Sequence, residues 1–374
     1  MSTPAFVPGL ELASGFYRDL VGPLLGQAFP QLRYSAALIG HGSEVLGFDS
    51  EMSTDHHWGP RVMLFLGAED LQAAEGEIRD FLSRKLPPLY RGWSTSFTAP
   101  DPADHGVQRL APAVPGTVNH RVELRSIEGY FRGYLGIDVS EEWSEADWLS
   151  IPTQKLRSLV AGAVFHDELG LDALRARLSW YPRDVWLYIL GCCWARIGQE
   201  EHLMGRAGSV GDEIGSALLG ARLVRDVMRA AFLLERSYPP YPKWFGSAFA
   251  GLACAEELLP SLAAALRARS WQEREVALTA AYESLLELQR SKGIVSEITG
   301  ESAAGVSRFW GRPFLVIRGD RVAQSVFSSI RSPTLRSLAE RLTIGSVDLW
   351  SDNTDLLENP TLRPCVAELC RGGA

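Results

Sequence analysis

The chain has 374 residues, of which 46% are hydrophobic and 22% are charged, and its formal net charge is −8. This composition is typical of a globular protein with enough apolar residues for a sizeable core, and the length corresponds to two or three domains. Proteins that bind nucleic acid usually present a basic face, so the negative charge argues against a nucleic-acid partner. We expect a small-molecule substrate instead.

The N-terminal stretch MSTPAFVPGLELASGF lacks the basic and long apolar regions of a secretory signal. No apolar run approaches the ~20 residues that a membrane-spanning helix needs. The five cysteines show no metal-binding CxxC spacing, and we expect them to be reduced and buried. These features predict a cytoplasmic protein without membrane association.

The first part of the chain predicts a small α/β domain over residues 1–135. Residues 10–30 have apolar residues at helical spacing, and the segment RYSAALIG (33–40) is typical of a short buried strand. HHWGPRVMLFLG (56–67) predicts a second strand, and AEDLQAAEGEIRDFLSRKLP (68–87) predicts an amphipathic helix. Residues 91–118 are rich in Gly, Pro, Ser and Thr and predict a loop, whereas residues 118–124 alternate as a third strand does.

From about residue 150 the hydrophobic period becomes helical. The segments 151–167, 171–182, 183–205, 210–238 and 270–293 all repeat apolar residues at a spacing near 3.6. They predict a helical domain over residues 150–295, followed by a C-terminal segment, 296–374, with a short strand at 312–318 and helices that pack on the rest. The predicted fold class is therefore α+β, with a mixed sheet and helices followed by a mainly helical bundle.

The stretch GHGSEVLGFDSEMSTDHHWGPR (residues 40–61) carries the densest group of polar residues. Gly42 and Ser43 predict a turn that lets the backbone approach a ligand, and backbone N–H groups at a helix start favour phosphate. On a strand, Asp55 and His57 would point to the same face, and Glu123 lies on the third predicted strand. The alternatives are a purely structural turn, a capping Asp55 and a surface Glu123, with His56 packed on the opposite face.

This pattern resembles the nucleotidyltransferase superfamily, the polymerase-β-like fold, whose signature is a Gly-Gly or Gly-Ser turn followed by an acid-x-acid pair that holds Mg²⁺. The chain is also similar, through segments such as IPTQKLRSLVAGAVFHD, WYPRDVWLYIL and GSVDLWSDNTDLL, to a family of actinobacterial proteins in which such a domain precedes a helical domain of unknown function. The resemblance implies that Gly42 and Ser43 hold a nucleoside triphosphate and that Asp55 binds Mg²⁺.

His57 stands where the resemblance implies the second acid of the metal pair. Mg²⁺ prefers oxygen ligands, whereas imidazole suits transition metals, so we expect weakened Mg²⁺ binding unless Glu44 or Asp49 replaces the missing acid. One alternative is a repurposed, metal-independent enzyme of specialised metabolism in which His57, which titrates near neutrality, transfers protons. Another is a protein that keeps the ligand pocket and performs no chemistry.

The helical part adds further candidates in GQEEHLMGRAGSVGDE (198–213) and in PYPKWFG (240–246). The resemblance implies a catalytic carboxylate from the helical domain, and Glu200 and Glu201 are both open for that role. Arg206 and Lys243 are candidates for stabilising charge on a transferred phosphate. We expect Ser43, Asp55, His57 and at least one of Glu123, Arg206 or Lys243 to line one cleft between the domains; solvated charges at a helix junction are the alternative.

Overall fold

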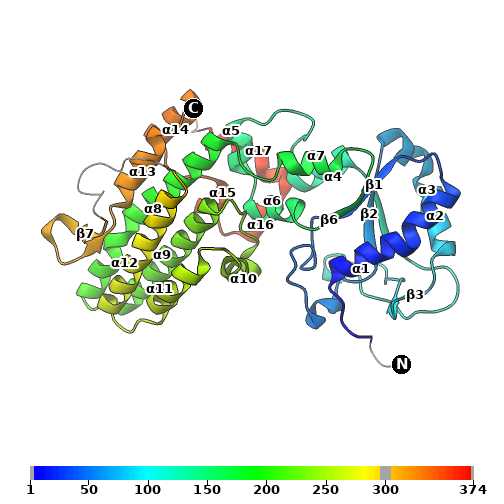
Figure 1. The fold of residues 1–374 in the computed structure, drawn as a ribbon, viewed down its shortest axis with the longest axis horizontal. Coiled ribbons are helices and arrows are strands. Elements are labelled where there is room, and N and C mark those ends of the chain that lie inside the picture. Colours follow the sequence, from blue (N-terminus) through cyan, green and yellow to red (C-terminus); the bar gives the residue numbers. More distant parts are fainter. Residues whose placement is uncertain (1–3, 295–304, 372–374) are drawn as a thin grey trace. The chain divides into compact units, whose positions relative to one another are not determined.

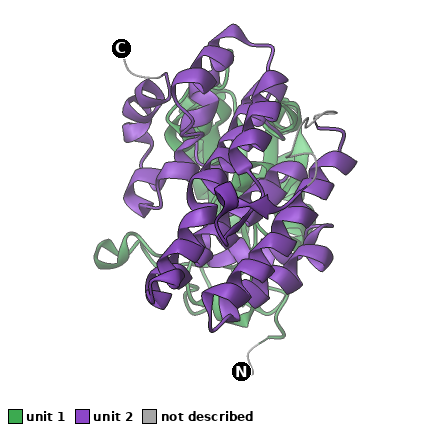
Figure 2. Ribbon diagram, turned by 90° about the vertical axis from the view of Figure 1, so that its left-hand side faces the viewer, with its two compact units in different colours: residues 1–142, 155–179 green, residues 143–154, 180–374 purple. Residues whose placement is uncertain are grey.

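The computed structural model describes residues 4–294 and 305–371. It combines a four-stranded mixed sheet with many helices, which confirms the predicted α+β fold class (Figure 1). The chain divides into two compact units: unit 1 comprises residues 1–142 and 155–179, and unit 2 comprises residues 143–154 and 180–374 (Figure 2). The division into domains at 135, 150 and 295 stays a prediction; in the structure, residues 155–179 belong to unit 1.

The sheet of unit 1 has the strand order β5-β2-β1-β6. Strand β1 (Tyr34–Leu38) pairs antiparallel with both β2 (Arg61–Leu66) and β6 (Ala163–Asp167), while β2 pairs in parallel with β5 (Arg121–Ser126). The sequence predicted β1, β2 and β5, although it placed β5 a few residues too early.

The helix predicted over residues 151–167 is wrong in its second half. Helix α6 (Thr153–Val160) ends early, and residues 163–167 form the edge strand β6. The cause is Gly162, whose positive φ of 72° turns the chain and whose missing side chain lets the backbone approach the Leu38 carbonyl of β1. A side chain at residue 162 would collide with that carbonyl.

One face of the sheet packs against the N-terminal helices. Helices α1 (Gly9–Phe16) and α2 (Gly22–Ala28), joined by the π-helical turn η1 (Tyr17–Val21), cross the sheet in Figure 1, and α3 (Ala68–Lys85) completes the layer. Alternate residues of β2 and β5 enter this core: Val62, Leu64, Leu66, Val122 and Leu124. On the opposite face, Tyr130 of α4 (Ile127–Leu135) packs with its ring 5.5 Å from that of Phe65.

Unit 1 contains further short elements between and after these. They are η2 (Glu51–Asp55), β3 (Leu89–Tyr90), β4 (Trp93–Ser94), η3 (Pro102–Asp104) and α7 (Leu171–Arg177). Strand β3 lies just before the predicted loop at 91–118, which contains β4, η3 and two isolated antiparallel bridges, Phe97 with Leu110 and Asp101 with Val107; the rest of that loop is irregular, as expected.

Unit 2 is built around the long helix α8 (Arg183–Ser209), which contacts α9 (Glu213–Leu234), α12 (Trp271–Ser291) and α13 (Gly319–Ser328). The helix-loop-helix junction given as the alternative for residues 198–213 is present, with α8 continuing to Ser209 and only residues 210–212 forming the turn before α9. Gly191 and Gly198 lie one heptad apart on α8, and a Cβ at either position would collide with Phe327 or with the backbone at Asp320. These glycines let α13 lie directly against α8.

The remaining elements of unit 2 are short. They are α5 (Glu145–Ser150), η4 (Pro242–Trp244), α10 (Phe245–Ala250), α11 (Ala255–Arg267), β7 (Ser307–Arg308), η6 (Phe309–Gly311), β8 (Leu315–Val316), α14 (Pro333–Arg341), α15 (Val347–Trp350), α16 (Thr354–Glu358), η7 (Pro360–Leu362) and α17 (Arg363–Cys370). Strand β8 lies within the strand predicted at 312–318, and residues 296–304 of the predicted C-terminal segment lie outside the described residues. Among residues 4–294 and 305–371, no helix has the length and apolarity to cross a bilayer.

Candidate functional site

The Gly-Ser turn encloses a buried ion pair. Arg61 donates through Nε and Nη2 to Oε1 of Glu44, at 2.9 and 2.6 Å, and through Nη2 to the His41 carbonyl at 2.8 Å. Gly42 has a φ of 131°, and a Cβ there would lie 2.7 Å from Nη2 of Arg61. Gly42 is thus required by the packing around this pair, and residues 43–47 form a turn, without the helix start that was expected to favour phosphate. A role of Gly42 and Ser43 in phosphate binding stays a prediction.

Asp55 and His57 do not share a strand face, so that expectation is wrong. Asp55 ends the 3-10 helix η2 and its exposed carboxylate lies 2.6 Å from Nδ1 of His56. His56 is therefore a surface residue and is not packed against the sheet. His57 adopts a left-handed conformation, with a φ of 53°, and its backbone N–H donates to the Gln108 carbonyl at 2.8 Å. The side chains of Asp55 and His57 therefore contact different residues, His56 and Arg121 respectively.

His57 instead faces the third strand. The Nη1 group of Arg121 donates to Nδ1 of His57 at 2.8 Å, so Nδ1 is an acceptor and the proton of the neutral ring lies on Nε2. Burial, with the positive charges of Arg121 and Arg61, lowers the pKa of His57 to about 4. His57 is therefore uncharged at neutral pH, and the expectation that it titrates near neutrality is wrong.

Strand β5 projects a row of charges from the face opposite the core. Glu123 lies between Arg121 and Arg125, with its carboxylate 3.5 Å from Nε of Arg121 and 3.7 Å from Nη2 of Arg125. Because partners in a parallel pair share a face, Arg61 on β2 stands beside Arg121. Burial and the neighbouring Arg61 lower the pKa of Arg121. The result is a group of cations held close together on one face.

A cavity of about 880 Å³ runs along the edge strand β5 and also reaches Arg79, Asp80 and Ser83 of α3; its volume is within the range of ~300–1,000 Å³ that is usual for small-molecule sites. Its lining includes His57, Ser96, Asn119, Arg121, Glu123 and Arg125. Two of the predicted site residues, His57 and Glu123, therefore line one cavity. Gly42, Ser43 and Asp55 do not belong to that lining.

The acidic residues near the motif do not fit an Mg²⁺ site. The carboxylate of Glu44 is bound to Arg61, and Oδ2 of Asp49 accepts hydrogen bonds from the Gly9 backbone and from Nε1 of Trp58, at 2.7 and 3.0 Å. In the part of the chain that the structure describes, no three His, Cys, Asp or Glu side chains are grouped so that they could hold a metal ion. Glu44 and Asp49 are thus engaged in other contacts and do not replace the missing acid, and Mg²⁺ binding at Asp55 stays a prediction.

The candidate carboxylates of the helical part serve two different contacts in unit 2. Glu200 forms an ion pair with Arg222. Glu201 is buried and accepts hydrogen bonds from the backbone N–H groups of Ile317 and Gly319, at 2.6 and 3.1 Å, where α13 begins. Burial raises the pKa of Glu201 to about 8. Glu201 thus joins α8 to the start of α13, which is a structural role.

Arg206 and Lys243 are both exposed on unit 2. Nζ of Lys243 lies 4.8 Å from the centre of the Trp244 ring, which is a cation–π distance. Because these residues belong to unit 2 and Asp55, His57 and Glu123 to unit 1, the single cleft that was expected to gather them stays a prediction.

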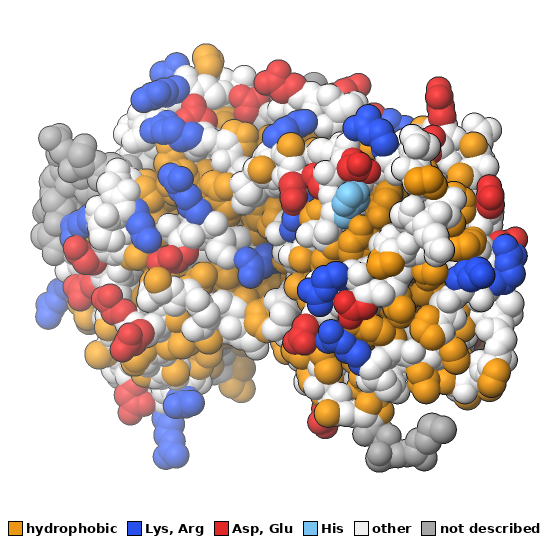
Figure 3. Space-filling model, turned by 45° about the vertical axis from the view of Figure 1, so that its right-hand side comes forward, with side chains coloured by type: hydrophobic (Ala, Val, Ile, Leu, Met, Phe, Trp, Pro, Cys, Tyr) orange, Lys and Arg blue, Asp and Glu red, His pale blue; other side chains and the backbone are white. Residues whose placement is uncertain are grey.

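Sequence reasoning missed the three arginines that dominate the face, Arg61, Arg121 and Arg125. A signal was present in the segment RVELR (121–125), where strand alternation places the two arginines and Glu123 on one side. On the face of the molecule that Figure 3 shows, basic and acidic side chains lie interspersed among hydrophobic ones.

Comparisons with known proteins assign no activity. Residues 148–245 match a family described as a domain of unknown function, DUF4037. No curated protein matches the chain. A solved structure to which the chain is similar is the nucleotidyltransferase-like protein from Exiguobacterium sibiricum, with 13% identity over 75% of this chain and 77% of that chain, and a TM-score of 0.32.

Proposed function

We propose that unit 1 binds the phosphate group of a small molecule in the cavity beside β5, through Arg121 and Arg125. The observation that carries this proposal is the unused donor capacity of Arg121. Its side chain is only 13% exposed, one N–H group is used by His57, and Nε makes no hydrogen bond among the described residues, since its nearest acceptor, the Glu123 carboxylate, is 3.5 Å away. A buried donor without an acceptor is costly, and a phosphate oxygen would satisfy it.

The charge balance of the face also favours an anion. Glu44 is paired with Arg61, and the charged residues that line the cavity are Arg79, Arg121 and Arg125 against Asp80 and Glu123. One positive charge is thus left over in a partly enclosed site, where its attraction for an anion is less screened than on an open surface. The polar side chains of Ser96 and Asn119 add further hydrogen-bonding groups to the lining.

The resemblance of the motif to the nucleotidyltransferase superfamily suggests a nucleoside triphosphate as the anion and nucleotidyl transfer to a small metabolite as the reaction class. Arg121 and Arg125 would then stabilise the charge of the phosphates. Glu44 and Asp49 are engaged by Arg61, Gly9 and Trp58, so the proposed reaction includes no metal-dependent step. The same observation favours a second candidate, a protein that binds the ligand without turnover.

Isothermal titration calorimetry with ATP, GTP, CTP and UTP, with and without Mg²⁺, tests the proposal. At least one nucleotide should bind, and Arg121→Gln should weaken it roughly tenfold or more, since hydrogen bonds to charged groups are worth about 1.5–3 kcal/mol. Arg84→Gln, an exposed arginine of α3 outside the cavity, is the matched control and should leave binding unchanged.

Two results would count against the proposal. Absence of heat with all four nucleotides and with inorganic phosphate would remove the phosphate site. Equal affinity of the parent and Arg121→Gln would place the ligand elsewhere. Nucleotide binding without pyrophosphate release, in the presence of a set of hydroxyl-bearing metabolites, would favour the binding protein over the transferase.

A further inference from the structure

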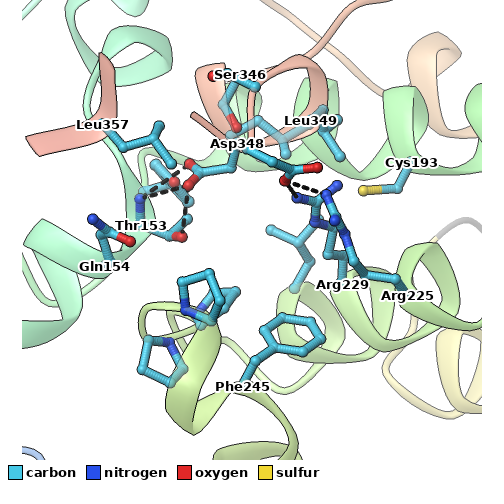
Figure 4. A pocket seen from close by; sticks show the side chains of 18 residues that line it. Thr153, Gln154, Cys193, Arg225, Arg229, Phe245, Ser346, Asp348, Leu349 and Leu357 are labelled. Carbon is cyan, nitrogen blue, oxygen red and sulfur yellow. Dashed lines mark hydrogen bonds and ion pairs between the residues drawn. The ribbon is translucent and has the colours of Figure 1, made fainter. Parts of the chain in front are cut away.

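Unit 2 contains a second cavity, of about 220 Å³, that plays no part in the proposed phosphate site (Figure 4). It lies between the start of α6, the helices α8 and α9, the proline-rich segment 239–245 and the segment 346–357. Its volume is below the ~300–1,000 Å³ usual for drug-sized ligands, so it suits a small molecule.

One side of this cavity is apolar. Leu233, Pro239, Pro240, Pro242, Phe245 and Leu357 line it. Figure 4 shows Phe245 across the cavity from Asp348, with Arg225 and Arg229 at one end. A ligand that fills the space must therefore present an apolar body to the prolines and Phe245, and a polar group to the arginines.

The polar end is formed by two arginines one helical turn apart on α9. Arg225 and Arg229 both donate to the same oxygen, Oδ1 of Asp352, and the Arg229 contact is long, at 3.4 Å. Two guanidinium groups at positions i and i+4 repel each other unless an anion lies between them. The carboxylate of Asp352 supplies that anion, yet its side chain is 64% exposed and it lies in the short connection between α15 and α16.

Arg229 is poorly satisfied by the side chains around it. It is only 12% exposed, its Nη1 has no hydrogen-bond partner within the described ranges, and its other carboxylate neighbour, Asp226, lies 3.6 Å away. Burial and the charge of Arg225 lower the pKa of Arg229. Asp226 itself is bound by Nε of Arg196 at 2.8 Å. A nearly buried guanidinium with long contacts retains the capacity to bind a better-placed oxyanion.

The buried charges allow one negative charge from a ligand. Without Asp352, the guanidinium groups of Arg196, Arg225 and Arg229 face two carboxylates, those of Asp226 and Asp348. Asp348 is already bound by Thr153, whose backbone N–H and Oγ1 donate to it at 3.0 and 3.1 Å. Three positive charges against two negative ones leave one positive charge, which a monoanion neutralises.

We propose that this cavity of unit 2 binds a small carboxylic acid with an apolar body, whose carboxylate takes the place of Asp352 on Arg225 and Arg229. In this arrangement, Asp352 occupies the anion position in the absence of the ligand and swings into solvent when the ligand enters. The apolar body lies against the proline-rich segment and Phe245.

Benzoate is the probe for this site, measured by isothermal titration calorimetry and by the shift in melting temperature of the full chain. Benzoate should bind with a stoichiometry near one, while benzyl alcohol, the neutral analogue, and acetate, which lacks the apolar body, should bind at least tenfold more weakly. Phenyl phosphate carries up to two charges and should bind more weakly than benzoate.

Replacement of Asp352 tests whether its carboxylate and the ligand compete for the same two arginines. Asp352→Asn removes the competing anion and should strengthen benzoate binding about two- to fivefold, because an exposed ion pair of this kind contributes little stability. If Asp352 had only a structural role, the Asp352→Asn variant would bind benzoate as tightly as the parent or more weakly. Asp355→Asn, another exposed carboxylate of the same segment, is the matched control and should not change the affinity.

Variants of the arginines complete the test. Arg225→Gln should weaken benzoate binding about tenfold or more, and it is preferred to a change at the more buried Arg229, which would leave Asp226 short of a partner. Arg206→Gln, an exposed arginine of unit 2 outside the cavity, is its control. Arg121→Gln in unit 1 should leave benzoate binding unchanged, so failure of the phosphate site and of this site are distinguishable.

Three outcomes would overturn the proposal. They are absence of benzoate binding to both the parent and Asp352→Asn, equal affinity of the parent and Arg225→Gln, and binding by Asp352→Asn that is equal to or weaker than that of the parent. Tighter binding of phenyl phosphate than of benzoate would overturn the assignment to a monocarboxylate.

Discussion

Arg121 of β5 donates a hydrogen bond of 2.8 Å to Nδ1 of His57, across 64 residues of chain. The histidine that the sequence placed in a metal pair is thus an acceptor for an arginine in this fold. The contact fixes the tautomer of His57 and orients the guanidinium of Arg121 at the edge of the unit 1 cavity.

The low pKa of His57 predicts a specific loss of stability in acid. In the folded state the pKa is about 4, whereas an unperturbed histidine titrates near 6.5, so between these pH values the unfolded chain binds a proton that the folded chain does not. The free energy of unfolding should therefore fall as the pH drops from about 6.5 to 4. His57→Gln keeps an acceptor for Arg121 and removes this titration, so its loss over that range should be smaller.

Urea unfolding of the parent and His57→Gln at several pH values measures the difference. His56→Gln, the same change at the neighbouring exposed histidine, is the control for the substitution itself. If the parent and His57→Gln lose stability in parallel from pH 6.5 to 4, the environment assigned to His57 is incorrect.

The buried pair of Arg61 and Glu44 predicts a large effect of removing one partner. Both side chains are nearly inaccessible, with 7% and 5% exposed, and Glu44→Gln leaves the Arg61 guanidinium buried without its counter-charge. We expect a loss of about 3–5 kcal/mol in the free energy of unfolding, the usual cost of breaking a buried pair. Glu51→Gln, an exposed acid of the same motif, should change it by less than about 0.5 kcal/mol.

Replacing both members of the pair checks the interpretation of that loss. The double variant Arg61→Met with Glu44→Met should be less destabilised than the two single changes added together, because neither charge is then left buried alone. Additive losses in urea unfolding would mean that the two side chains do not interact.

Two helical glycines should respond in opposite ways to replacement by alanine: Gly198, which lies in the close packing of α8 on α13, and Gly76, which lies on the open side of α3. A Cβ at residue 198 would collide with the backbone at Asp320, so Gly198→Ala should lower the free energy of unfolding by about 1–3 kcal/mol despite its better helix propensity. A Cβ at Gly76, within α3, meets no atom within 4 Å among the described residues, and Gly76→Ala should raise it by up to about 1 kcal/mol. Thermal or urea unfolding decides, and stabilisation by Gly198→Ala would contradict the packing.

The cysteines predict the thiol reactivity of the folded protein. Cys365 is exposed, whereas Cys192, Cys193, Cys254 and Cys370 are buried, and burial raises the pKa of Cys193 to about 12 and that of Cys254 to about 11. A thiol reagent at pH 8 should label one cysteine quickly in the native state and five after denaturation. Cys365→Ser should remove the fast reaction, and rapid labelling of two or more thiols would show that the buried set is accessible.

Local patterns in the sequence were sufficient for most of the elements. The alternation or apolar runs of β1, β2 and β5, and the 3.6-residue spacing of α3, α8, α9 and α12, depend on residues close together in the chain. These patterns depend on whether a segment buries one face or two, and the order of apolar and polar residues along the segment shows which. The α+β fold class and the helical character of most of residues 183–291 followed from these patterns.

The composition of the candidate site depended on the tertiary structure more than the helices and strands did. The sequence named His57 and Glu123, which line the unit 1 cavity, but it assigned His57 to a strand and omitted Arg61 and Arg121. The direction of His57 depends on a left-handed backbone conformation and on a hydrogen bond to Gln108, neither of which leaves a periodic signal. The sequence determined which segments could form strands and helices, because those preferences are local. Tertiary contacts determined that residues 163–167 complete the sheet and that burial, together with Arg121, lowers the pKa of His57, because pairing partners and neighbouring groups come from distant parts of the chain.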